Sequence, residues 1–168
     1  NLLKNTLNIY KTKMMELIYL SNLGQEEKEL LKKIPALITI LIGSADDNLD
    51  EKEIHMGKLS TEFRKDHGEP LVQNYFEWVS SEYDSIFKRE WSQLKLITLD
   101  ERLQLISKEL ALTNDILHKL DKKFAHELVS SWRGLARAVA NSSGGVLGRL
   151  TVSYEERDYI GLDMIDFK

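Results

Sequence analysis

The fold of this chain is decided by one apolar stretch, residues 30–43, which read LLKKIPALITILIG. Its apolar residues recur at the three- and four-residue spacing of an α-helix. They cover most of the helix circumference rather than one stripe, which is typical of a helix buried on all sides. Pro35 either kinks this helix or begins its second part. The stretch therefore predicts a central helix around which the other elements pack.

The rest of the chain is also helical by pattern. Only two prolines and nine glycines occur in 168 residues, and these are the residues that interrupt helices most strongly. Apolar residues recur at helical spacing in six further segments, near residues 3–18, 54–66, 70–87, 99–110, 124–139 and 154–164. Because no strand pattern stands beside them, we expect an all-α fold, a single compact bundle of about seven helices.

Details of three segments follow from local signals. We expect Ile54, Leu59 and Phe63 to face the core from the helix that ends at residues 67–68. Pro70 suits the first position of the next helix, because its missing N–H has no helical partner there. A further break is predicted near residues 113–115 or near Asp121, and the sequence leaves both open.

Composition excludes several classes of function. With 42% apolar and 30% charged residues the chain is typical of a folded globular protein. A net charge of −4 argues against general nucleic-acid binding, and the absence of cysteine excludes disulfides, zinc–thiolate sites and thiol catalysis. The longest apolar run is about half of the ~20 residues that a membrane-spanning helix needs. We expect a cytoplasmic protein; what lies upstream of Asn1 stays open.

The most distinctive motif follows the central helix, where residues 46–53 read DDNLDEKE. Calcium and magnesium prefer oxygen ligands, and this segment offers the side chains of Asp46, Asn48, Asp50 and Glu53. Its five carboxylates are offset only by Lys52, and like charges ~4 Å apart cost about 1 kcal/mol per pair in water. A cation would relieve this crowding. We predict a divalent-cation site here, with calcium expected and magnesium or manganese as alternatives.

A metal-free interpretation of the same residues stays open. Asp50 and Glu53 have the spacing of a capping box, in which each side chain accepts a hydrogen bond from the other residue's N–H. Aspartate and asparagine also stabilise turns without any ion. The segment is not an EF-hand, because Glu51 and Gly57 stand where that loop requires glycine and glutamate.

A second turn has a similar plan. Residues 140–148 read ANSSGGVLG and follow the apolar segment 124–139. Ser153 and Glu156 then have capping-box spacing at the start of the last predicted helix. Taken alone, the glycines indicate a flexible connector. Together with the first turn, they give a helix-turn-helix arrangement that occurs twice.

Both turns resemble those of the tellurite-resistance protein TerB family, a duplicated helix-turn-helix domain. Residues 45–53 fit its first turn, A-D-G-x-[IVL]-[DS]-x-x-E, except that Asp47 replaces the glycine. Residues 143–148 and 153–156 are similar to its S-G-G-x-x-G and S-x-x-E elements. The resemblance covers residues 34–168, which leaves residues 1–33 as an N-terminal helical extension packed on the domain.

This resemblance implies a non-catalytic, divalent-cation-binding module of a bacterial stress-response system. It further implies a protein partner, at the inner face of the membrane. The candidate metal ligands carried over from the family are Asp46, Asp50 and Glu53 in the first turn and Asn141, Ser153 and Glu156 in the second. The second set holds one carboxylate and is expected to bind weakly.

Other readings are an enzyme and a metal-free adaptor. The sequence HELVS at residues 126–130 nearly matches the zinc motif H-E-x-x-H, but Ser130 replaces the second histidine. We therefore predict that the protein is not an enzyme. The adaptor would bind a protein partner through Trp78 and Trp91 and through a basic patch. That patch would comprise Lys122, Lys123, Arg133, Arg137 and Arg149.

Overall fold

The computed structural model describes residues 2–142 and 159–167, and within them the protein is all-α, with eight helices and no strand. The helices are α1 (Leu2–Ile18), α2 (Gln25–Gly43), α3 (Glu51–His67), α4 (Pro70–Ser80), α5 (Tyr83–Leu94), α6 (Leu99–Ala111), α7 (Thr113–Leu117) and α8 (Lys122–Ser142). The all-α prediction is confirmed.

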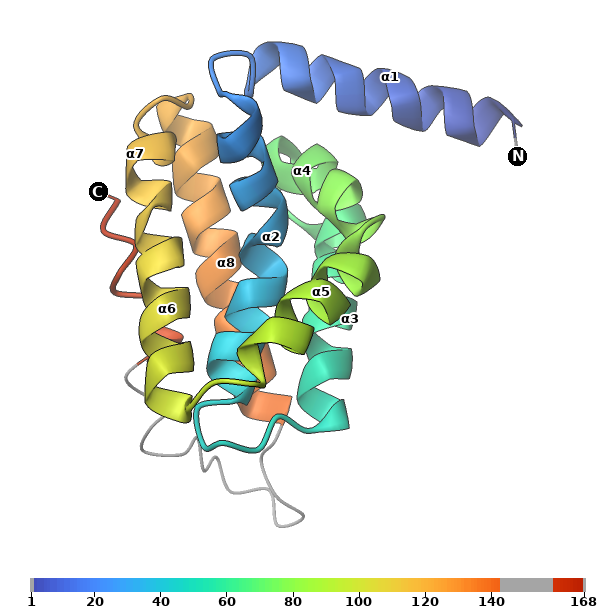
Figure 1. The fold of residues 1–168 in the computed structure, drawn as a ribbon. Coiled ribbons are helices and arrows are strands. Elements are labelled where there is room, and N and C mark those ends of the chain that lie inside the picture. The colour runs from blue at the N-terminus through green and yellow to red at the C-terminus, as the bar shows by residue number, and fades with distance from the viewer. Residues whose placement is uncertain (1, 143–158, 168) are drawn as a thin grey trace.

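Helices α2 and α8 form the centre of the bundle, with α3, α4 and α5 on one side and α6 and α7 on the other (Figure 1). From Leu31 to Gly43, all but two residues of α2 are fully buried. Helix α1 lies across one end of the bundle and has α4 as its principal neighbour. The predicted central helix is therefore confirmed.

Helix α2 continues through Pro35 because other side chains complete its hydrogen bonding. A proline at position 35 has no N–H for the carbonyl of Leu31, one turn earlier. The Tyr75 hydroxyl donates to that carbonyl at 2.7 Å, and Trp132 Nε1 lies 3.2 Å from the same hydroxyl. Both aromatic side chains are fully buried. A polar chain from α8 through α4 thus replaces the hydrogen bond that Pro35 removes.

Helix α3 faces the core with small residues. The prediction that Leu59 and Phe63 face the core was wrong, whereas Ile54 does pack against it. Leu59 and Phe63 are 46% and 58% exposed, whereas Gly57 is buried. A Cβ atom at Gly57 would overlap Thr39 and lie 2.6 Å from the Tyr83 hydroxyl. Because α3 approaches α2 and α5 through this glycine, its larger apolar residues turn outward.

The remaining boundaries agree with expectation only in part. Helix α4 begins at Pro70 as predicted, but the predicted segment 70–87 is divided between α4, which ends at Ser80, and α5. Helix breaks fall both before Thr113 and before Lys122. A domain boundary between residues 33 and 34 would fall inside α2. Of the last predicted helix, 154–164, residues 154–158 lie outside the described residues; residues 159–160 are helical, but 161–164 are not, so the prediction was wrong for that end. None of the helices described is both long and apolar enough to cross a bilayer.

Candidate functional site

The acidic turn, residues 46–53, begins with the capping box that its spacing predicts. Asp50 Oδ1 accepts from the N–H of Glu53, and Glu53 Oε2 accepts from the N–H of Asp50, both at 2.9 Å. Glu53 is only 2% exposed. Two backbone donors that α3 cannot satisfy internally are thereby paired. The predicted capping box is confirmed.

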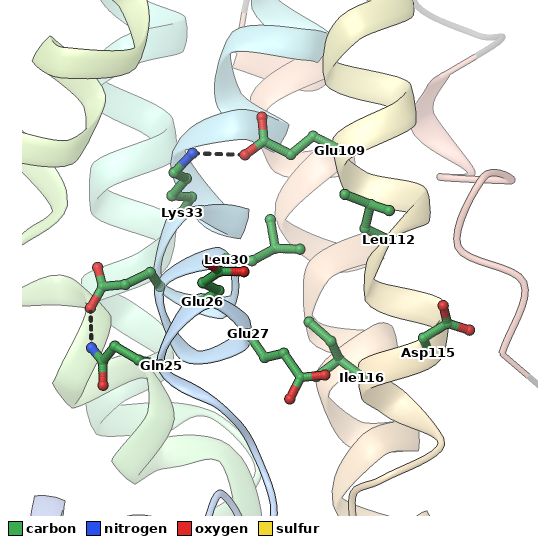
Figure 2. Close-up of a pocket in the computed structure, with 10 residues that line it drawn as sticks. Gln25, Glu26, Glu27, Leu30, Lys33, Glu109, Leu112, Asp115 and Ile116 are labelled. Atoms are coloured by element: carbon green, nitrogen blue, oxygen red, sulfur yellow. Dashed lines mark hydrogen bonds and ion pairs between the residues drawn. The ribbon is translucent and has the colours of Figure 1, made fainter.

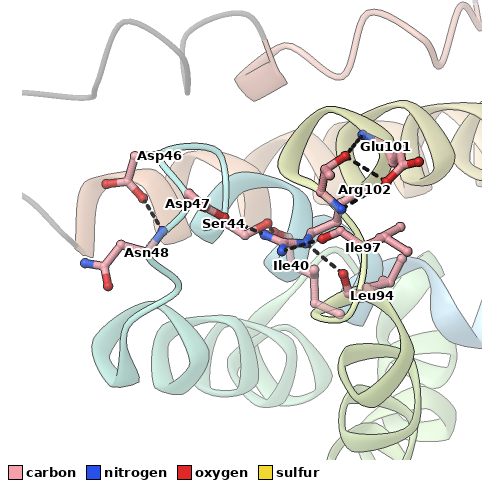
Figure 3. Close-up of polar contacts among 10 residues, drawn as sticks. Ile40, Ser44, Asp46, Asp47, Asn48, Leu94, Ile97, Glu101 and Arg102 are labelled. Atoms are coloured by element: carbon pink, nitrogen blue, oxygen red, sulfur yellow. Dashed lines mark hydrogen bonds and ion pairs between the residues drawn. The ribbon is translucent and has the colours of Figure 1, made fainter.

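The other side chains of the turn stabilise its backbone or pair with α6 (Figure 3). Asp46 Oδ1 accepts from the N–H of Asn48 at 3.0 Å, which closes an Asx turn. Asp47 adopts a φ of 63°, the left-handed conformation that favours glycine. Its carboxylate lies 3.3 Å from the guanidinium of Arg102. Asp47 thus adopts a conformation that favours glycine and adds an ion pair with Arg102.

Arg102 anchors the turn from a buried position. It is 5% exposed and donates to the carbonyls of Leu94 and Ile97 at 3.0 and 3.4 Å. Its guanidinium also lies 5.1 Å from the centre of the Trp91 ring, a cation–π distance. The charge of Asp47 is therefore balanced by a cation of the chain itself.

These contacts bear on whether the acidic turn fits a cation. Among the described residues, no three His, Asp or Glu side chains are arranged to hold one ion. Asp50 and Glu53 cap α3, and Asp46 holds its own turn. The donor set as folded therefore does not fit a calcium cage, which takes six to eight oxygen ligands. Cation binding at Asp46, Asn48, Asp50 and Glu53 stays a prediction.

The second predicted ligand set lies mostly beyond what the structure describes. Asn141 is exposed in the last turn of α8. Ser153 and Glu156 fall outside the described residues. The duplicated arrangement of two matching turns stays a prediction as well.

The aromatic residues of the adaptor hypothesis contact cations of their own chain. Trp78 and Trp91 are half-buried and pack against the core. The Lys32 ammonium lies 5.1 Å from the Trp78 ring centre, as Arg102 does from Trp91. Arg133 donates to the carbonyls of residues 161 and 165. One face of each tryptophan ring is therefore covered by a cation of the chain itself, and exposed apolar surface also lies elsewhere.

Such a surface is a groove of about 490 Å³ between the first half of α2 and the α6–α7 segment (Figure 2). We call it the acidic groove; it is lined by Gln25, Glu26, Glu27, Glu29, Leu30, Lys33, Glu109, Leu112, Asp115 and Ile116. Leu30, Leu112 and Ile116 give it an apolar lining, and Leu112 is 60% exposed. Five carboxylates and one ammonium surround these residues.

Two ion pairs fix the walls of the acidic groove. Lys33 Nζ on α2 lies 2.7 Å from Glu109 on α6. Burial opposes the charge of Lys33, but the Glu109 and Glu90 carboxylates outweigh it and raise the pKa of the ammonium. Glu27 accepts from Lys119 at 2.6 Å and from the N–H of Gly24 at 2.9 Å. These bonds lower the pKa of Glu27, so this carboxylate keeps its charge in mildly acidic solution.

Other carboxylates of the groove are open to a ligand. Within residues 2–142 and 159–167, neither Glu26 nor Asp115 has an ion-pair or hydrogen-bond partner, and both are exposed. Figure 2 shows them on opposite walls, on α2 and α7. The acidic groove thus combines exposed leucine with uncompensated negative charge.

Sequence reasoning missed this groove, although one signal for it was present. The predicted core stripe of α6 contains Leu103, Ile106 and Leu110, which are buried. Leu105 and Leu112 lie off that stripe and are 50% and 60% exposed. Their separation of seven residues places them on one helix face. Large apolar residues off the core stripe therefore marked a second apolar surface.

Comparisons with known proteins do not assign the chain to a family. No family model matches it, and neither a curated protein nor a solved structure matches it. The resemblance to the TerB family therefore stays a prediction carried by the residues of the two turns.

Proposed function

We propose that this chain is a non-catalytic helical module that binds a basic amphipathic helix of a protein partner in the acidic groove. The observation that carries the proposal is the exposed Leu112 between the unpartnered carboxylates of Glu26 and Asp115. The proposal keeps the partner-binding adaptor predicted from the sequence but moves its binding surface from the tryptophans to α2, α6 and α7.

The shape of the groove supports a helix as the ligand. Amphipathic helices dock their apolar face into hydrophobic grooves through residues spaced three and four apart. The lining residues Leu30, Leu112 and Ile116 would receive such a face. Lysines beside that face would then meet Glu26 and Asp115 across the two walls. Opposite charges of this kind increase the association rate and select the partner.

The test uses a fluorescein-labelled amphipathic peptide of leucine and lysine, whose binding is measured by fluorescence anisotropy. We expect the double variant Glu26→Lys, Asp115→Lys to weaken binding about tenfold, since each reversal replaces an attraction by a repulsion. Leu112→Ser should weaken binding through lost apolar contact. Added salt should weaken the wild-type complex, because exposed charges are screened.

Matched controls separate the groove from general charge effects. Asp100→Lys and Leu96→Ser change an exposed carboxylate and a leucine that is 75% exposed, both outside the groove. Both should bind the peptide as the wild type does. A peptide with glutamate in place of lysine should not bind. Equal losses in groove and control variants would refute the proposal.

Cation binding at the acidic turn is the second candidate. It is favoured by the exposed carboxylates of Asp46 and Asp47 side by side. Cation binding is less well supported than helix binding in the groove. The capping, turn and ion-pair contacts already satisfy the carboxylates of the turn.

A further inference from the structure

Helix α1 exposes a row of large apolar residues. Leu3, Leu7, Tyr10 and Met14 are 88%, 57%, 67% and 55% exposed. Figure 1 shows α1 projecting beyond the bundle. Contiguous apolar surface of this kind marks an interaction site in a folded protein.

The spacing of this row specifies a helix as its partner. The four residues are separated by four, three and four positions, which is the a/d spacing of a heptad. Lys4, Lys11 and Lys13 are exposed on the same helix, against a single glutamate in its sequence. Helix α1 is therefore itself a basic amphipathic helix, the ligand class inferred for the acidic groove.

Pairing of α1 with another α1 is disfavoured by these lysines. In the heptad set by Leu7 and Tyr10, Lys4, Lys11 and Lys13 fall at the e and g positions that flank the seam. Two such helices side by side would bring lysine against lysine. The acidic groove, with its five carboxylates and one ammonium, offers the opposite charge.

Docking of α1 into the groove of its own chain is opposed by the α1–α2 connection. Tyr19 stacks on Phe124 with ring centres 4.3 Å apart, and Leu20 and Leu23 are buried. These anchors direct α1 along α4, while the groove begins at Gln25 on the opposite side of α2 (Figure 1). A second copy can present its α1 to the groove without disrupting these anchoring contacts.

We infer that α1 of one copy binds in the acidic groove of a second copy, so that the chain self-associates. The inference rests on the proposed function, because it names a ligand for the same groove. The Leu3–Leu7–Tyr10–Met14 row covers Leu30, Leu112 and Ile116, and the lysines of α1 face Glu26 and Asp115. Two reciprocal contacts of this kind close a symmetric dimer.

The test measures molar mass by light scattering after gel filtration of the full chain over a range of concentrations. The wild type should reach at least twice the 19.4 kDa of one chain. The α1 variant Lys4→Glu, Lys11→Glu, Lys13→Glu should be monomeric, and so should the groove variant Glu26→Lys, Asp115→Lys. An equimolar mixture of the two variants should recover the mass of a dimer, because their charges are again complementary.

Several outcomes would overturn the inference. If α1 paired with α1, the neutral variant Lys4→Gln, Lys11→Gln, Lys13→Gln would associate more strongly than the wild type, because the repulsion between lysines would be gone. Docking in the acidic groove requires that this variant associates more weakly. If neither charge variant changed the molar mass, the contact would lie elsewhere. Failure of the mixed variants to associate would lead to the same conclusion. The control variant Lys122→Glu, Lys123→Glu reverses two exposed lysines on α8 and should leave the dimer intact. Circular dichroism of each variant verifies that it is folded.

The peptide experiment distinguishes failure of this inference from failure of the proposed function. A wild type that stays monomeric at every concentration overturns the inference. If that protein still binds the leucine–lysine peptide in its groove, the proposed function stands and the partner is another protein. If it binds no peptide, both fail.

Discussion

The acidic turn and the acidic groove lie at opposite ends of α2 and use similar side chains differently (Figure 1). In the turn, Asp46, Asp50 and Glu53 accept hydrogen bonds from the chain's own backbone. In the groove, Glu26 and Asp115 have no partner among the described residues and stand beside an exposed leucine. The contacts of the turn therefore stabilise the fold, whereas the groove carries the free charge on which the proposed binding rests.

The difference shows that a count of carboxylates does not identify a binding site. Carboxylates within a few residues of a helix start satisfy its free N–H groups. Carboxylates contributed by separate helices have no such local partner. Where they also surround exposed apolar side chains, their charge is available to a ligand.

The largest effect should come from removing the anchor of the acidic turn. Arg102→Ala leaves the carbonyls of Leu94 and Ile97 and the carboxylate of Asp47 without their donor. We expect the free energy of unfolding to fall by about 3 kcal/mol, since buried groups lose hydrogen bonds to a charged partner. Urea denaturation measures this.

A matched arginine tests whether burial is the cause. Arg89 is 57% exposed and pairs with Glu90 at 2.9 Å. Arg89→Ala should cost about 1 kcal/mol or less, as for other surface ion pairs. Equal losses from Arg89→Ala and Arg102→Ala would contradict the role given to Arg102.

A smaller effect is expected from the capping box. Asp50→Ala should lower the free energy of unfolding by about 1 kcal/mol, the usual contribution of an N-cap side chain. Glu26→Ala, which removes a carboxylate from the groove, should change it by less than about 0.5 kcal/mol. Peptide binding should show the reverse order: Glu26→Ala should weaken it more than Asp50→Ala does. Loss of peptide binding in Asp50→Ala without loss of stability would contradict the different roles given to the turn and the groove.

The smallest effect is expected from divalent cations. The protein, first stripped with chelator, should melt at the same temperature with or without millimolar calcium, magnesium or manganese, because the turn carboxylates already have partners. A cation at ~100 times its dissociation constant would add about 2.7 kcal/mol, a shift of roughly 5–11 °C in a domain of this size. Such a shift, abolished by Asp50→Asn with Glu53→Gln, would support the cation-site hypothesis.

Much of the fold could be predicted because its signals are local. The central helix, the start at Pro70 and the capping box at Asp50 each depend on residues within one or two helical turns. The orientation of α3 could not be predicted, because it is set by Gly57 against Thr39 and Tyr83, residues far apart in sequence. A glycine gives no apolar signal, so the pattern of Leu59 and Phe63 was misleading.

The candidate site was harder to predict. Its acidic and apolar residues come from segments 25–33 and 109–116, which are ordinary amphipathic helices when considered separately. The carboxylates of the acidic turn, by contrast, stand next to one another in the sequence and drew attention for that reason. Which of these carboxylates have a partner is visible only in the tertiary structure. Asp47, for example, pairs with Arg102, which is 55 residues away in the sequence.

The sequence by itself determined where helices form and how they begin, because helix periodicity and capping act between residues a few positions apart. Tertiary structure decided which charges stay uncompensated and which apolar residues stay exposed. Those properties depend on which distant segments meet: Lys33 with Glu109, Asp47 with Arg102, and Pro35 with the Tyr75 that makes α2 continuous. Packing of the whole bundle, rather than local hydrogen bonding, therefore created the acidic groove.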